Sequence, residues 1–207
     1  MIKFVYFDLG GVVINDFSKN NKWEVMKKVM GVKPSFEKEF DEFYDKYEHE
    51  DVCLTRPVDT LIPILEEKFN MKFPKEFSMN QYFIDHFDRN SFIEPVIKEI
   101  NIKSKIGILS NQYVDMFEGI QKKNILPKVK WDVVVDSTKV LLQKPDPKIF
   151  EYATNKAGVL KQEILFVDNS QKNIDAGIKF GWQTFFYNSA NHKKSSEELL
   201  TFYRSFR

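Results

Sequence analysis

The sequence predicts an α/β protein, a doubly wound parallel sheet that is interrupted after its first strand by a helical insertion. Short apolar runs alternate with helical segments at the start and in the second half of the chain, which is the pattern of βαβ units. The stretch between them, residues 16–91, carries aromatic residues at three- and four-residue steps and no clear strand. The 207 residues, 43% of them hydrophobic, suit one large domain or a core domain with a smaller inserted one.

The first predicted strand, residues 3–7, runs directly into Asp8, Gly10 and Gly11. A packed strand interior has no use for a carboxylate, but a tight turn that glycine permits can present one to a ligand at the carboxyl end of a strand. Asp8 could equally cap the turn or the next helix. This stretch alone leaves both interpretations open.

Residues 16–91 are predicted to form a helical cap. Pro34 with Ser35 is a helix-start signal, and Pro57 opens another helical segment. We interpret the aromatic stripes of this segment as core and infer no cofactor from them. The α/β core then comprises residues 1–15 and 92–207, and the cap, inserted at the carboxyl end of the first strand, is placed to act as a lid.

The rest of the core is predicted from residue 92 onward. Further strands are expected at residues 105–109, 131–135, 163–167 and 183–187. Helices are expected at residues 92–102, 148–157 and 173–180, the last closed by Gly181, with a weakly helical tail at residues 199–207. Strands that alternate with helices predict a parallel sheet covered on both faces.

Polar side chains follow several of these strands. Asp8, Ser110 with Asn111, and Asp168 stand at three strand ends, and Lys144 lies in a loop before a helix. Because the carboxyl ends of the strands of a doubly wound sheet converge on one crevice, we expect these groups to share a site.

Composition excludes several classes of function. The net charge of +1 provides no field that would recruit nucleic acid or an anionic membrane. A single cysteine, Cys53, excludes a disulfide framework and favours a reducing compartment. No apolar run approaches the length of a membrane span and no signal peptide is evident, so a cytoplasmic protein is expected. The oligomeric state is not predicted.

Four motifs, in order, resemble those of the haloacid dehalogenase (HAD) superfamily. They are Phe-Asp-Leu-Gly-Gly-Val, Leu-Ser-Asn, Lys-Pro-Asp-Pro-Lys-Ile-Phe and Phe-Val-Asp-Asn-Ser-Gln-Lys-Asn-Ile-Asp-Ala-Gly. The inserted helices resemble the helical cap of subfamily I, and the Asp-Leu-Gly form is similar to a branch of phosphatases that act on glucose 1-phosphate. The resemblance implies a Rossmann-like HAD core.

The resemblance also implies a Mg²⁺-dependent phosphatase of a small phosphorylated metabolite, such as a sugar phosphate. Asp8 would be the nucleophile that forms an aspartyl-phosphate, and Mg²⁺ would bind Asp8, the carbonyl of Gly10 and Asp168. The Ser110 hydroxyl and the backbone N–H of Asn111, at a helix start, would donate to the phosphate, and Lys144 would neutralise charge.

Two departures from the family pattern leave alternatives open. Gly10 stands where a second aspartate usually supplies the general acid, and Asn169 replaces a second acid in the fourth motif. Asp16 could fold back over the site as an acid, or could cap the first cap helix. The alternatives to a phosphatase are a metal-independent 2-haloacid dehalogenase, against which Asp168 speaks, and a non-catalytic binding protein.

Overall fold

A five-stranded parallel sheet forms the centre of the computed structural model, which describes residues 1–206 apart from the side chain of His49. The strand order is β5-β4-β1-β6-β7. The strands are β1 (Phe4–Phe7), β4 (Lys105–Ser110), β5 (Val133–Asp136), β6 (Ile164–Asp168) and β7 (Gln183–Phe186). The order reverses direction at β1, so the doubly wound α/β fold predicted from the sequence is confirmed.

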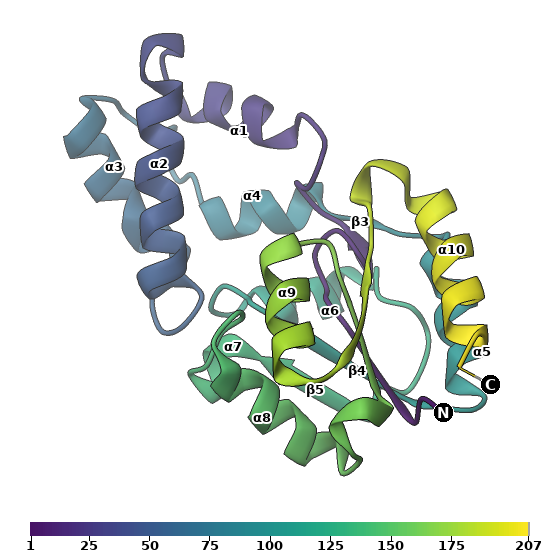
Figure 1. Ribbon diagram of the computed structural model, residues 1–207. Helices are drawn as coiled ribbons and strands as arrows, with labels where there is room; N and C mark the ends of the chain where they lie inside the picture. The colour runs from purple at the N-terminus through teal and green to yellow at the C-terminus, as the bar shows by residue number, and fades with distance from the viewer. Residues whose placement is uncertain (207) are drawn as a thin grey trace.

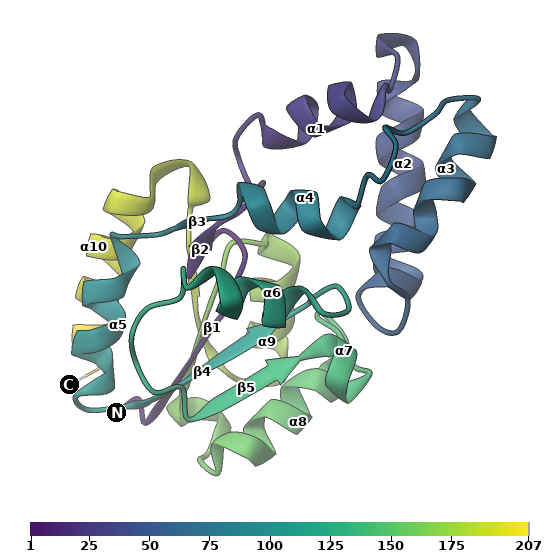
Figure 2. The same cartoon turned by 180° about the vertical axis from the view of Figure 1, so that it is seen from behind.

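The central strand β1 is buried on both faces of the sheet, and its side chains alternate between two hydrophobic clusters. Val5 and Phe7 pack with helices α5 (Ile93–Asn101), α6 (Met116–Lys123) and α10 (His192–Arg204). Phe4 and Tyr6 pack with α8 (Pro147–Ala157) and α9 (Gln171–Phe180). Figures 1 and 2 show α8 and α9 on one side of the sheet and α5 with α10 on the other. This two-sided cover explains why β1 reads as an unbroken apolar run.

The helical insertion stands apart from the sheet, above the end at which the strands finish (Figure 1). Its helices are α1 (Lys22–Met30), α2 (Glu37–Tyr47), α3 (Ile62–Phe69) and α4 (Met79–His86), with short helical turns at Pro34–Phe36, Glu48–Val52 and Val58–Leu61. The chain enters and leaves the cap through an antiparallel ribbon of β2 (Ile14–Asn15) and β3 (Asp88–Arg89). The expectation that residues 16–91 contain no strand was therefore wrong at β3, because two residues are too few to show a strand period.

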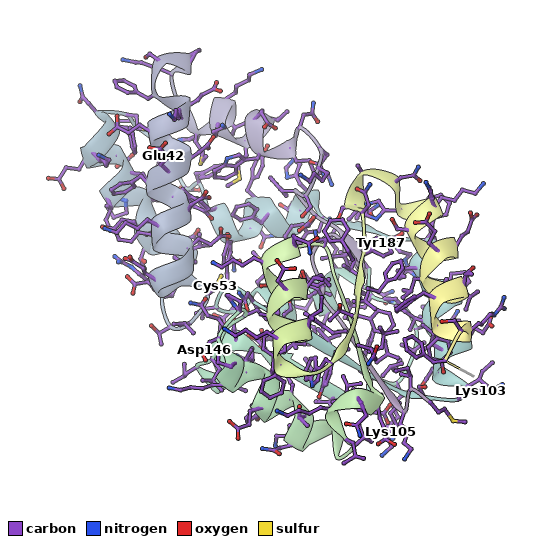
Figure 3. All side chains as sticks on the ribbon, in the orientation of Figure 1. Glu42, Cys53, Lys103, Lys105, Asp146 and Tyr187 are labelled. Atoms are coloured by element: carbon purple, nitrogen blue, oxygen red, sulfur yellow. The ribbon has the colours of Figure 1, made fainter. Side chains whose placement is uncertain are left out.

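The cap packs directly on the core. Ile84 of α4 lies against Gly119 of α6, where an added Cβ would come within 2.4 Å of its Cδ1 atom, so the glycine allows the two helices to approach closely. At the other end of the cap, the Ser137 hydroxyl donates to the carbonyl oxygen of Cys53 over 2.5 Å. Figure 3 shows Cys53 at the end of the cap that lies next to the core. Two separate contacts therefore seat the cap over the strand ends.

Two helical details differ from the expectation. A short helix, α7 (Ser137–Val140), follows β5 without having been predicted, and α10 begins at His192, well before residue 199. The side chain of Asn191 caps α10 by accepting from the N–H of Lys194 over 3.1 Å, and polar composition hid this start. Among the described residues, no helix is long and apolar enough to cross a lipid bilayer.

Candidate active site

The polar groups at the strand ends surround one cavity of about 550 Å³ between the cap and the core. Asp8 follows β1, Ser110 ends β4, Asp168 ends β6, and Lys144 comes from the loop before α8. Asp8, Ser110 and Lys144 line the cavity, whereas Asp168 lies beneath it with no exposed surface. The parallel sheet thus brings together residues that are more than a hundred positions apart in the chain.

Lys144 joins the two carboxylates of the site. Its Nζ atom lies 2.9 Å from Oδ1 of Asp8 and 2.6 Å from Oδ2 of Asp168. Burial alone would lower the pKa of the Lys144 ammonium, but the charges of the two carboxylates outweigh burial and raise it. Burial raises the pKa of Asp168 to about 6, although Lys144 opposes the rise. Lys144 thus shares one positive charge between two carboxylates, so the formal charges of Lys144, Asp8 and Asp168 sum to −1.

The Asp8 carboxylate is oriented through one of its oxygens. Oδ1 accepts from the N–H of Leu9 over 2.7 Å, the hydroxyl of Ser110 over 2.8 Å and the ammonium of Lys144. Within the described residues, every hydrogen bond to this carboxylate goes to Oδ1, which leaves Oδ2 available to a ligand. Ser110 in turn accepts from Nε2 of Gln112 over 2.8 Å. Sequence reasoning missed the buried Gln112, whose only signal was its place two residues after Ser110.

Asn111 differs from its predicted setting. It lies in a loop and not at a helix start, because α6 begins only at Met116. Its side chain holds the backbone of Lys144: Oδ1 accepts from the Lys144 N–H over 2.8 Å, and Nδ2 donates to the Lys144 carbonyl over 3.0 Å. The observed contact of Asn111 thus positions the lysine.

Asp168 is held by groups of the following helix. The N–H of Ser170 donates to Oδ1 over 2.7 Å, and Nδ2 of Asn173 lies 3.3 and 3.2 Å from the two carboxylate oxygens. Asn173 was not singled out from the sequence, although it stands in the fourth motif, five residues after Asp168. Donors from α9 and from Lys144 together compensate the burial of this carboxylate.

Asn169 lines the same cavity, but its side-chain amide binds two serine hydroxyls. Its Nδ2 donates to the hydroxyls of Ser18 and Ser189, over 3.1 and 3.0 Å, while Ser189 donates its own proton to the carbonyl of Gly11 over 2.8 Å. Since the Ser189 hydroxyl has given its proton to Gly11, it needs a donor at position 169. An aspartate there would oppose two acceptors, which explains the amide.

Asp16 lies on the cap linker and lines the same cavity as Asp8. Burial raises the pKa of its carboxyl to about 6; a hydrogen bond from Ser18 opposes the rise and the neighbouring charge of Asp8 adds to it. Oδ1 accepts from the N–H of Ser18 over 2.8 Å. Asp16 therefore borders the cavity without belonging to the Lys144 cluster.

The cap side of the cavity is aromatic and acidic. Tyr113 of the core and Tyr44 of α2 lie with their hydroxyls 2.9 Å apart, and Tyr113 also donates to Glu48. Trp23 of α1 and Phe83 of α4 stack at 6.2 Å between ring centroids and line the same space. A ligand that reaches the strand ends would meet ring faces and hydroxyls on its far side.

The donor chemistry of the site fits a hard divalent cation. Asp8 and Asp168 provide carboxylate oxygens of net negative charge, and the carbonyl of Gly10 lies in the same loop as Asp8. Among the described residues, no group of three or more His, Cys, Asp or Glu side chains could hold a metal ion. A cation at the strand ends would therefore depend on two carboxylates, backbone oxygen and water.

Comparison with known proteins places these features in a family. Residues 2–181 match the model of the haloacid dehalogenase-like hydrolases. The (S)-2-haloacid dehalogenase 4A of Burkholderia cepacia is 30% identical over 79 residues, which are 38% of this chain and 34% of that protein. The chain thus matches about a third of the length of this curated relative.

Solved structures of two kinds share the fold. The HAD family enzyme BT-2542 of Bacteroides thetaiotaomicron, in complex with magnesium and inorganic phosphate, has a TM-score of 0.67 at 19% identity, over 91% of this chain and 96% of that one. The L-2-haloacid dehalogenase of Xanthobacter autotrophicus has a TM-score of 0.65 at 17% identity, over 99% of this chain and 88% of that one. At these identities the similarity establishes the fold alone.

Proposed function

Since the chain belongs to the haloacid dehalogenase-like hydrolases, we propose that it is a phosphatase that hydrolyses a small phosphate monoester through an aspartyl-phosphate on Asp8. The observation that carries the proposal is Asp168, fully buried and joined through Lys144 to the Asp8 carboxylate. Lys144 supplies one positive charge to two carboxylates, and the negative charge that remains suits a divalent cation.

Each residue of the site has its own role in the proposed reaction. Oδ2 of Asp8 attacks phosphorus while the bond from phosphorus to the leaving oxygen breaks, and water later cleaves the aspartyl-phosphate to regenerate the carboxylate. Lys144 and the Ser110 hydroxyl, both within 3 Å of Oδ1 of Asp8, orient the nucleophile and lie close enough to interact with phosphoryl oxygens. Asn111 keeps Lys144 in place through its backbone.

Asp8, Asp168 and the carbonyl of Gly10 are the groups that would hold Mg²⁺. When bound, this ion supplies the positive charge that lets a carboxylate approach a phosphate dianion. The aromatic and hydroxyl-bearing cap wall suits a leaving group with both ring faces and hydroxyls, such as a sugar.

A metal-independent 2-haloacid dehalogenase is the second candidate, because the Burkholderia cepacia relative carries that name. The cavity argues against it. Of the described residues that line it, the basic ones are Lys19 and Lys144, and Lys144 is already paired with two carboxylates. The carboxylate of a 2-haloacid would face Asp8 and Asp16 with little compensating charge.

A substrate panel separates the candidates. Phosphate release from phosphate monoesters and halide release from (S)-2-chloropropionate are measured with Mg²⁺ and with EDTA. The proposal expects Mg²⁺-dependent phosphate release that is lost in Asp8→Asn, a nearly isosteric change, and kept in Asp175→Asn, which alters an exposed carboxylate on α9. Halide release that persists in EDTA would establish the dehalogenase instead, and the absence of both activities would favour a binding protein.

A further inference from the structure

The carboxyl of Asp16 fills the space that a side chain at position 10 would occupy. A Cβ atom added to Gly10 would lie 2.5 Å from Oδ2 of Asp16 and 3.3 Å from its Cγ. Gly10 is the second residue after Asp8, in the loop that the first strand enters. Because Gly10 has no side chain, the carboxyl of Asp16 can occupy this space.

This carboxyl is held in place but is not neutralised. The Ser18 N–H binds Oδ1 over 2.8 Å, which directs Oδ2 toward Gly10. Among the described residues, none forms an ion pair with Asp16, whereas Asp8 and Asp168 both share the ammonium of Lys144. Asp16 thus lines the cavity outside the Lys144 ion pairs, with one oxygen directed toward Gly10, and this position allows it to exchange a proton with a ligand.

We propose that Asp16 is the general acid and base of the phosphatase reaction; the assignment rests on the proposed function. In the first step, Asp8 forms its bond to phosphorus, the bond to the leaving oxygen breaks, and that oxygen takes the proton of the Asp16 carboxyl and departs as an alcohol. In the second step, the Asp16 carboxylate takes a proton from water. The water oxygen bonds to phosphorus, the bond to Asp8 breaks, and phosphate leaves with Asp16 protonated again.

The position of Asp16 in the chain links the acid to the cap. It directly follows β2, which pairs with β3 in the ribbon that connects cap and core. Its carbonyl accepts from the side chain of Asn20 over 2.8 Å, just before α1 begins. An acid at position 16 belongs to the linker that leads into the cap, whereas an acid at position 10 would belong to the core.

The test compares leaving groups of graded pKa. Turnover of aryl and alkyl phosphates is measured for the native protein, for Asp16→Asn, and for Asp88→Asn, a control that removes an exposed carboxylate from the same ribbon. Asp16→Asn is expected to lose about 10²–10⁴-fold in turnover of alkyl phosphates, whose leaving oxygen needs a proton. With 4-nitrophenyl phosphate it should release a burst of nitrophenol equal to the enzyme concentration, because the second step then limits turnover.

A relocation variant distinguishes chemistry from structure. Gly10→Asp combined with Asp16→Gly should recover part of the alkyl phosphatase activity, whereas Gly10→Asp alone, which forces two carboxyls into one space, should not exceed the native protein. No loss with either class of ester in Asp16→Asn, or a loss with 4-nitrophenyl phosphate that shows no burst, would overturn the role of Asp16 while Asp8-dependent hydrolysis continued. If the native protein released no phosphate from any ester, the proposed function itself would fail.

Discussion

Replacing Lys144 with methionine should cost much of the stability of the fold. The side chain is 1% exposed and lies between two carboxylates, at 2.9 and 2.6 Å. Removing one partner from a buried ionic cluster typically costs about 3–5 kcal/mol, because the remaining charges are left uncompensated. In a chain of this size, where 1 kcal/mol corresponds to ~2–4 °C, the midpoint of thermal unfolding should fall by ~6–20 °C.

The stability lost in Lys144→Met should increase as the pH rises. Without the ammonium, the pKa of Asp168, which burial already raises to about 6, should rise further. A carboxyl whose pKa is higher in the folded state loses stability as the pH rises through that value. The difference between the native protein and Lys144→Met should therefore be largest above pH 7 and should narrow toward pH 5.

Urea unfolding in EDTA at pH 5 and pH 7.5 measures both effects. Lys139→Met is the matched control, because Lys139 pairs with Glu118 at 3.0 Å on the surface, where such pairs contribute about 0–1 kcal/mol. The reasoning would be refuted if Lys144→Met unfolded within 1 kcal/mol of the native protein at pH 7.5, where ~3–5 kcal/mol is expected. A deficit that grew toward pH 5 would refute it equally.

Three further predictions concern the metal, the first loop and the cap linker. Asp168→Ala should abolish Mg²⁺ binding measured by titration calorimetry, since one of two carboxylate ligands is lost; undiminished binding would place the metal elsewhere. Gly11→Ala should destabilise the protein more than Gly158→Ala in urea: both have positive φ (70° and 67°), but an added Cβ at Gly11 would lie 2.1 Å from Nδ2 of Asn169 and one at Gly158 meets nothing within 4 Å. Burial raises the pKa of Asp16 to about 6, so the stability of the native protein in EDTA should fall as the pH rises from about 4 to 6. Asp16→Asn should flatten that fall. If the variant and the native protein lost stability in parallel over this range, the raised pKa of Asp16 would be contradicted.

The sequence by itself predicted the sheet and the residues at its strand ends. Apolar runs such as residues 4–7, and the polar residues that follow them, are local signals. A parallel doubly wound sheet places all its carboxyl ends at one edge, so Asp8, Ser110 and Asp168 could be grouped without coordinates. The two-residue strand β3 was missed because its signal is shorter than any period.

Only the tertiary structure determined which hydrogen-bond partner each polar side chain has. Asn111 faces the Lys144 backbone and Asn169 faces Ser18, a residue 151 positions away, so each amide found partners that its neighbours in sequence do not indicate. The contact between Asp16 and Gly10 likewise depends on where the cap linker crosses the first loop. The sequence shows which groups lie near each strand end, but the direction of each side chain follows from packing between distant segments. Here that packing places the carboxyl of Asp16 next to Gly10.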